Sequence, residues 1–293
     1  MKRLDCAAFD SATLLDTCIG QLKSPADTNR FVAAKAALLD GYDAYAAMAG
    51  QRELYGAQSF LHGHDDQIIC GQLTKGDLTS LYSKVMLDKD GAARKVYDQL
   101  LALPSLAICP YCGLGQVYTL DHFLAKARYP QFSVLCQNLV ACCETCNKKM
   151  GGGVATADNI GVHPYFEEAA IEGVTWLTAT LHESAPASAT FHVGQVAAWS
   201  PELTKRVKNN FDQLELASRY AVAAANELAS NAEILKLMRS AMEIRSHLEK
   251  TSVGLSNRAP NSWQAALHRA LFASDWYVNG GYAAKSPGIG LAP

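Results

Sequence analysis

The chain has 293 residues, of which 49% are hydrophobic and 18% are charged, and its formal net charge is -2. This composition excludes a wholly disordered or fibrous protein, and the length suffices for one large domain or two smaller ones. The net charge slightly disfavours a protein that coats DNA in general, so any contact with nucleic acid must come from a local basic patch.

The start of the chain predicts a cytoplasmic protein without a membrane partner. Lys2 and Arg3 are basic, but Asp5 and Asp10 come soon after them, so no apolar segment of a signal peptide forms. The sequence contains no run of 18 apolar residues, so no membrane span is expected. In the cytosol, nine cysteines do not indicate a disulfide framework, and clustered cysteines indicate a metal site.

Residues 1–104 are predicted to form an N-terminal helical region. A buried stripe at helical spacing is carried by Phe31, Ala34, Leu38 and Tyr42. A second helix is expected in KGDLTSLYSKVMLDKDG, with Asp77 or Thr79 near its start. A third is expected in AARKVYDQLLAL, which runs to Pro104.

Residues 166–293 are predicted to form a β-hairpin followed by a helical region. The strands are expected at 174–181 and 189–196. Helix is expected from Pro201, which suits a first helical turn, to about Lys250. SVGLSNRAPN is predicted to be a loop before a last helix that Asn261 or Ser262 would cap. The C-terminal segment NGGYAAKSPGIGLAP is predicted to be irregular.

Two Cys-x-x-Cys pairs stand 30 residues apart in the middle segment, 105–165. They are Cys109 with Cys112 and Cys143 with Cys146. Together they offer four thiolates, the ligand set of a closed, tetrahedral structural zinc site. The alternative is that these cysteines are small buried hydrophobic residues. Cys136 and Cys142 lie close by, and Cys6, Cys18 and Cys70 are interpreted as ordinary thiols.

Polar residues of another kind lie between and just after these pairs. GQVYTLDHF is predicted to be a strand that ends in Asp121 and His122, and NLVACC a returning strand that begins at Asn138. ETCNKKM is predicted to be a helix that carries Asn147 and ends at the glycines from Gly151.

From Cys109 to about Gly153, this ordered set resembles the HNH endonuclease superfamily, which has the ββα-metal fold. The resemblance implies that His122 is the general base and that Asp121 and Asn147 bind the catalytic metal. It implies that Asn138 braces the loop that holds the base. Many members of the family have a final His where this chain has Asn147. The resemblance also implies cleavage of phosphodiester bonds, most often in DNA, and extends to the nucleases of bacterial anti-phage and restriction systems.

The chemistry of these residue types agrees with those roles. A neutral imidazole can take a proton from water near neutral pH, and a divalent cation can neutralise charge on a phosphate. Asp121 and Asn147 offer oxygen ligands, which favour Mg²⁺ or Mn²⁺ over zinc. Lys126, Arg128, Lys148 and Lys149 could neutralise backbone phosphates, or could form an ordinary solvated face.

Two further histidine motifs are left open by the sequence. His163, in GVHPYF, could add a residue to the site, although a packed histidine is favoured. HGHDD, at 62–66, resembles a ligand cluster, although a solvated loop is favoured.

The sequence therefore predicts an α+β fold, mainly α-helical, with a central ββα-metal motif stapled by a four-cysteine zinc site and flanked by helical regions. The predicted function is a metal-dependent endonuclease, with zinc in the thiolate site and Mg²⁺ or Mn²⁺ in the oxygen site. The helical flanks are expected to bind a regulatory partner such as an ATPase or sensor, or to restrain the nuclease. The alternatives are a non-catalytic zinc module that binds nucleic acid or protein, and a helical interaction scaffold.

Overall fold

The computed structural model describes residues 1–5 and 9–284, so Cys6 and the C-terminal part of the predicted irregular tail lie outside the described residues. The chain divides into two compact units, Lys2–Glu168 and Ala169–Pro293, the second together with Met1. The first unit contains both the predicted helical region 1–104 and the predicted nuclease segment 105–165. The second begins three residues after the predicted boundary at 166.

The helices of the first unit differ in whether a side chain caps their start. They are α1 (Ser11–Gly20), α2 (Pro25–Gln51), α3 (Lys75–Ser80), the π-helix η2 (Leu81–Met86) and α4 (Ala92–Leu101). Asp10 caps α1 and Ser24 caps α2 through backbone amides of the first turn. Thr74 caps α3, and Asp77 is the third residue of the same capping box. The predicted start at Asp77 or Thr79 is therefore a few residues late.

Short strands and turns connect these helices. β1 (Ile68–Cys70) pairs with β2 (Leu73–Thr74) in an antiparallel ribbon. Four 3₁₀ turns of this unit are η1 (Leu54–Gly56), η3 (Ser105–Ala107), η4 (Pro130–Phe132) and η5 (Cys136–Asn138).

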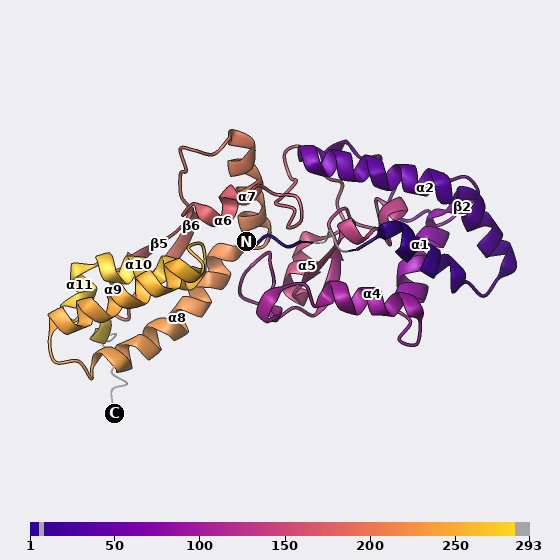
Figure 1. Ribbon diagram of the computed structural model, residues 1–293. Helices are drawn as coiled ribbons and strands as arrows, with labels where there is room; N and C mark the ends of the chain where they lie inside the picture. Colours follow the sequence, from indigo (N-terminus) through magenta and orange to yellow (C-terminus); the bar gives the residue numbers. More distant parts are fainter. Residues whose placement is uncertain (6–8, 285–293) are drawn as a thin grey trace, which may run out of the picture. The chain divides into compact units, whose positions relative to one another are not determined.

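The predicted strand–strand–helix segment is present. β3 (Thr119–His122) pairs with β4 (Leu139–Cys142) in antiparallel register, and α5 (Glu144–Met150) follows β4 directly. Gly151, with a φ of 70°, ends α5. α4 packs on both strands and α5 contacts β3. Figure 1 shows α2 and α4 on either side of the part of the unit that holds α5.

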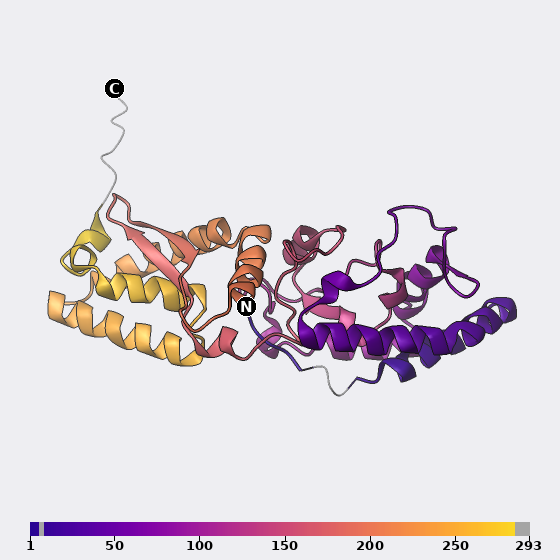
Figure 2. The same cartoon turned by 90° about the horizontal axis from the view of Figure 1, so that it is seen from above.

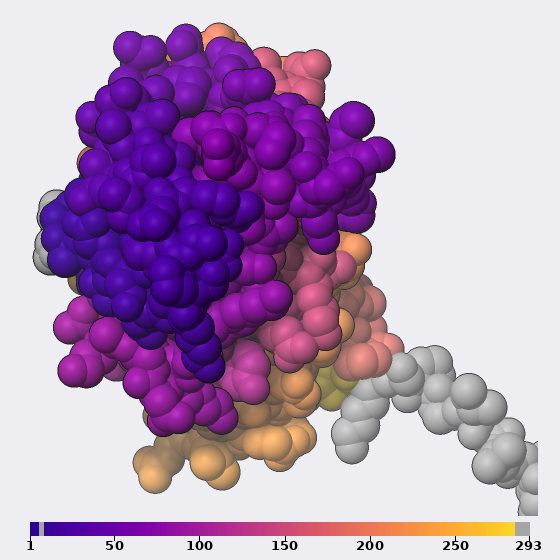
Figure 3. Space-filling view, turned by 90° about the vertical axis from the view of Figure 1, so that its right-hand side faces the viewer, coloured from indigo at the N-terminus to yellow at the C-terminus, as the bar shows by residue number. Residues whose placement is uncertain are grey.

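One apolar core joins the helices of the first hundred residues to these strands. It includes Leu14, Tyr45 and Leu100 from the helices, with Leu120 and Leu139 from β3 and β4. In the space-filling view of Figure 3, residues of the first hundred positions, coloured indigo to purple, make up most of the face that is drawn. The helical flank and the strand–strand–helix segment are therefore parts of one folded body.

The second unit is a β-hairpin packed on helices. Its elements are α6 (Ala170–Gly173), β5 (Leu177–His182), β6 (Ser188–Val193), α7 (Pro201–Gln213), α8 (Leu216–Leu235), α9 (Ala241–Arg258), α10 (Trp263–Ala273), α11 (Asp275–Val278) and the 3₁₀ turn η6 (Gly281–Ala283). β5 and β6 are antiparallel, β6 packs on α8, and β5 packs on α10. Figure 2 shows this hairpin beside the helices of its unit.

The predictions for the second unit are confirmed for the hairpin, for Pro201 in the first turn after the Ser200 cap, and for Ser262 as the last cap. The predicted loop 252–261 is wrong for most of its length, because α9 continues to Arg258. Ser252 is buried there, and a side chain at Gly254 would meet only open space, so the helix tolerates both residues.

The fold is thus mixed α and β, with mostly helix and three small antiparallel sheets among the described residues. Within the same part of the chain, no helix combines the length and apolar character that a membrane span requires.

Candidate metal centre and adjoining site

The four paired cysteines meet in one buried cluster. The Sγ atoms of Cys109, Cys112, Cys143 and Cys146 all lie within 4.8 Å of one another. The Cys112 and Cys143 sulfurs are 3.8 Å apart. Zinc–sulfur bonds of about 2.3 Å in a tetrahedron place the sulfurs about 3.8 Å apart. The cluster therefore has the size of a tetrahedral thiolate metal site, and Cys142 is not part of it.

Two backbone turns present these thiols. The Gly115 amide donates to Cys112 Sγ at 3.4 Å, and the Cys146 amide donates to Cys143 Sγ at 3.5 Å. Amide hydrogens directed at sulfur stabilise thiolates in metal sites. A Cβ on Gly115 would lie 2.8 Å from Cys143 Sγ, so only glycine allows this close approach.

The thiols cannot all ionise at such short distances without a cation. Hydrogen bonding between Cys109 and Cys112 is the largest cause that lowers the pKa of Cys112, and the same contact raises the pKa of Cys109. A bound cation would replace these shared protons and allow all four sulfurs to be thiolates.

Asp121 lies in β3, between the two cysteine pairs in sequence, and is 4% exposed. Its carboxylate accepts a hydrogen bond from the Tyr111 hydroxyl at 3.4 Å, and Tyr111 belongs to the first cysteine turn. Burial raises the pKa of Asp121 to about 7, while the Tyr111 bond opposes the shift. The carboxylate is therefore held in a place that disfavours its charge in the absence of a nearby cation.

His122 follows in the strand and has different neighbours. Its Nε2 lies 2.9 Å from the carbonyl oxygen of Ser133. A carbonyl only accepts, so Nε2 carries the hydrogen and, in the neutral ring, Nδ1 is the acceptor. Burial lowers the pKa of His122 to about 3, so the ring is uncharged at neutral pH. The Tyr82 ring lies against it, with centroids 4.4 Å apart in a T-shaped arrangement.

Asn138 is fully buried and spans the loop between β3 and β4. Its Oδ1 accepts from the Leu124 amide at 2.8 Å and from the Tyr45 hydroxyl at 3.1 Å. Its Nδ2 donates to the carbonyls of Leu124, at 3.1 Å, and Phe132, at 3.2 Å. These bonds tie Leu124 and Phe132, near the two ends of the segment that follows His122, to one side chain.

His163 is a packed residue that supports Asn138. Its Nδ1 accepts from the Tyr165 amide at 3.2 Å, so Nε2 carries the hydrogen and faces the Tyr45 hydroxyl at 3.0 Å. Tyr45 can then accept from His163 Nε2 and donate to Asn138 Oδ1, so the hydrogen bonds run in one direction from His163 to Asn138. Burial lowers the pKa of His163 to about 3. The structure thus favours the packed interpretation over a ligand role.

Asn147 is half-buried in the first turns of α5, and its amide donates to the Cys143 carbonyl at 3.0 Å. Because α5 contacts β3, the helix that carries Asn147 adjoins the strand that carries Asp121. Of the four predicted basic residues, Lys148 pairs with Glu144 at 2.8 Å on the exposed face of the helix.

Of the other three basic residues, Lys126 and Arg128 lie in the loop after β3 and Lys149 lies in α5. Lys126 lies over the Tyr82 ring, with Nζ 4.8 Å from the centroid. Arg128 donates to the Phe60 carbonyl at 3.4 Å, and Lys149 is half-exposed on α5.

The HGHDD segment does not form a metal cluster. Within the part of the chain that the structure describes, the four cysteines are the one group of such side chains close enough to share an ion. The side chains from His62 to Asp66 are exposed.

Sequence reasoning missed the aromatic residues that surround the site. Tyr45, Tyr82 and Tyr111 contact Asn138, His122 and Asp121 respectively. Tyr45 continues the predicted buried stripe of α2 by one turn. This spacing could have predicted that the ring is buried, but not that its hydroxyl contacts Asn138. Nothing in the sequence identifies the Ser133 carbonyl as a partner of His122.

Comparison with known proteins finds a relative encoded by Escherichia phage lambda, Protein ea31. It is 27% identical over 296 residues, and the match covers 96% of this chain and 100% of that protein. The similarity therefore spans both compact units. No family model matches the chain, and no solved structure matches it.

Proposed function

We propose that the protein is a metal-dependent HNH endonuclease that hydrolyses phosphodiester bonds, with DNA as its substrate. The observation that carries this proposal is the state of His122. A bond between Nε2 and the Ser133 carbonyl orients the neutral imidazole and leaves Nδ1 as its acceptor, and the buried residue Asp121 precedes His122 in β3. This is the arrangement that a general base requires.

The surrounding fold supports the proposal. Two antiparallel strands and a following helix carry Asp121, His122 and Asn147, and the cysteine cluster joins the turn before β3 to the start of α5. A structural zinc in that cluster would hold the strands and helix together, because four thiolates leave no open position for a substrate.

The residues fit a second, catalytic cation of the oxygen-binding kind. Asp121 is buried, its bond from Tyr111 is long at 3.4 Å, and burial raises its pKa, so a cation beside it would favour the ionised form. Asp121 and Asn147 would hold Mg²⁺ or Mn²⁺. When bound, the ion would supply neutralisation of charge on the phosphate and on the leaving oxygen.

The chain's own residues then have separate tasks. His122 Nδ1 accepts the proton of the attacking water, and the Ser133 carbonyl keeps the ring in the required tautomer. Asn138 holds the loop after His122 in place. Lys126, Arg128, Lys148 and Lys149 contact backbone phosphates, which carry no base sequence information.

The test is plasmid cleavage with Mg²⁺, Mn²⁺ or EDTA, together with zinc quantification. We expect His122→Ala to retain zinc and to lose cleavage by about 10²- to 10⁴-fold. His182→Ala is the matched control, since His182 lies on the exposed hairpin of the other unit. Cleavage by pure His122→Ala at the wild-type rate would refute the base assignment. Absence of metal-dependent cleavage on double-stranded DNA, single-stranded DNA and RNA would favour a non-catalytic zinc module.

We further propose that this cytoplasmic nuclease is an effector of an anti-phage or restriction system. A regulatory partner such as an ATPase or sensor would restrain it. A relative encoded by a phage is compatible with that setting. Purification of the native protein from its own host should bring the partner with it. Recovery of the active protein alone would count against this part of the proposal.

A further inference from the structure

The segment Thr74–Met86 contacts the loop after β3 at two separate places. At its start, Lys75 is 2% exposed, and its Nζ donates to the carbonyls of Leu61 and Ala127, both at 2.6 Å. Further along the segment, the Tyr82 ring meets His122 and Lys126. This helical segment, far from the cysteines in sequence, is thus part of the wall of the candidate site.

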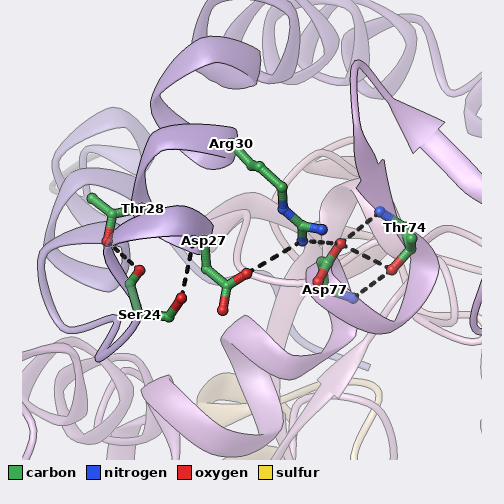
Figure 4. A network of polar contacts seen from close by, with 6 residues as sticks. All are labelled: Ser24, Asp27, Thr28, Arg30, Thr74 and Asp77. Atoms are coloured by element: carbon green, nitrogen blue, oxygen red, sulfur yellow. Dashed lines mark hydrogen bonds and ion pairs between the residues drawn. The ribbon is translucent and has the colours of Figure 1, made fainter.

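A polar network anchors the start of this segment to the long helix α2. Thr74 and Asp77 form a reciprocal capping box at the start of α3. Arg30 of α2 forms ion pairs with Asp77 and with Asp27, and Ser24 caps α2 nearby. Figure 4 shows the Arg30 guanidinium between the two carboxylates. One charge-assisted ion pair, between Arg30 and Asp77, therefore joins the beginning of α3 to α2, and the other bonds of the network hold the first turn of each helix.

Directly after α3 the chain continues as the π-helix η2, which carries Tyr82 in its first turn. Single π-turns occur frequently at functional sites, since they change the direction of the side chains beyond them. The Tyr82 hydroxyl donates to the Leu120 carbonyl in β3 at 3.3 Å, which ties the residue to the strand that bears His122. The ring is 6% exposed.

Tyr82 contacts both groups that the proposed chemistry would use. Its ring centroid lies 4.4 Å from that of the His122 imidazole, and Lys126 Nζ lies 4.8 Å from the same ring centroid. A T-shaped aromatic pair restricts rotation of the imidazole, and a cation–π contact restricts the ammonium group. The Ser133 bond sets the tautomer of His122, whereas the Tyr82 ring limits its tilt.

We infer that Tyr82 is a positioning residue of the candidate nuclease site, delivered by the α3–η2 segment to hold His122 and Lys126 in register with the same phosphate. This inference rests on the proposed function. It gives the N-terminal helices a direct task in the reaction, beyond that of covering the strands.

The experiment compares ring-retaining with ring-deleting variants of the full-length, zinc-loaded protein. Tyr82→Phe keeps the ring and loses the bond to Leu120, so we expect cleavage within about threefold of wild type. Tyr82→Leu deletes the ring, and kcat should fall about 10- to 100-fold with KM changed less than about threefold. Tyr82→Met fills the volume without a ring and should behave as Tyr82→Leu does.

Tyr97→Leu is the matched control. Tyr97 is as buried as Tyr82 and lies beside it, with centroids 6.5 Å apart, but Tyr82 rather than Tyr97 contacts His122. A purely structural effect would lower kcat equally in both leucine variants. Folded Tyr82→Leu or Tyr82→Met with wild-type kcat would overturn the inference.

Nuclear magnetic resonance of ¹⁵N-labelled histidine separates this inference from the proposed function. The His122 ring signals, assigned with His122→Gln, should show one ordered Nε2–H tautomer in wild type and Tyr82→Phe. In Tyr82→Leu and Tyr82→Met the imidazole should tilt away from the Ser133 carbonyl and weaken the bond that sets its tautomer, so the His122 signals should show averaging or a shifted equilibrium. If the wild type cleaves no nucleic acid, the proposed function fails, yet unchanged His122 signals in the ring-deleting variants would still refute the positioning role.

Discussion

Each of the two compact units contains a buried asparagine that binds four polar groups. In the first unit, Asn138 binds Leu124, Phe132 and the Tyr45 hydroxyl. In the second, Asn261 accepts from the amides of Trp176 and Leu177 and donates to the carbonyls of Ile171 and Val174, which precede the hairpin. Both residues satisfy backbone groups that a loop would otherwise leave unpaired inside the protein.

The difference lies in what each asparagine is connected to. The side chain of Asn261 binds backbone groups of the segment that leads into the hairpin, so its role ends there. Asn138 continues through Tyr45 to His163 and holds the loop that begins beside His122. The same residue type therefore has two roles. In the second unit, Asn261 binds backbone groups alone, whereas in the first unit Asn138 also belongs to a hydrogen-bond network that includes Tyr45 and His163 and adjoins the candidate site.

The largest expected effect comes from breaking the cysteine cluster. Cys112→Ser removes one thiolate, and structural zinc in such a site contributes on the order of 10 kcal/mol, so we expect metal loss and unfolding of the first unit. All four tryptophans lie in the second unit, at positions 176, 199, 263 and 276, so their fluorescence should still report a folded state. Hydrogen exchange and zinc quantification measure the outcome.

Cys70→Ser is the control for that experiment, because Cys70 is a half-buried thiol outside the cluster. Loss of the tryptophan signal together with zinc would show that the two units unfold as one. This result would contradict the expectation that the second unit stays folded when the first unfolds.

The two asparagines themselves give the second prediction. Asn138→Ala and Asn261→Ala each leave several buried backbone groups without a partner, and each should cost about 2 to 4 kcal/mol of unfolding free energy. In urea titrations, Asn261→Ala should shift the tryptophan transition, whereas Asn138→Ala should shift hydrogen exchange of β3 and β4. Equal shifts of the tryptophan transition by both variants would contradict the prediction that each asparagine stabilises its own unit.

The smallest expected effect is the pH dependence that His163 adds to the unfolding free energy of the first unit. Burial lowers the pKa of His163 to about 3 from its ordinary value of 6.5. Between these values the unfolded chain binds a proton that the folded chain does not, so stability falls as pH falls below 6.5. The loss approaches about 1.4 kcal/mol per pH unit, or on the order of 2 kcal/mol by about pH 5.

His163→Gln removes this titration and should lower the slope of β3 and β4 exchange stability by up to about 1.4 kcal/mol per pH unit between about pH 6.5 and about pH 5, while the contribution of His122 remains. An unchanged slope in the variant would show that other groups carry the acid sensitivity.

The parts of the fold that were predicted from sequence are those that depend on neighbouring residues. The predicted cap Ser262 and the predicted first-turn residue Pro201 act within one turn, and Gly151 ends α5 through its own φ. The strand–strand–helix order from Thr119 to Met150 follows from local apolar patterns and turns. The paired cysteines were found because ligand chemistry requires a fixed residue type at a fixed spacing.

The contacts that define the candidate site were decided by tertiary structure alone. Tyr45 and His163 are 118 residues apart, and the Tyr82 ring of η2 meets His122 where its hydroxyl binds the Leu120 carbonyl of β3. The partner of His122 is a backbone carbonyl, which every residue possesses and which no residue type reveals. Local sequence therefore determined which groups were available, whereas long-range packing decided which of them meet, because such contacts depend on the whole chain being folded.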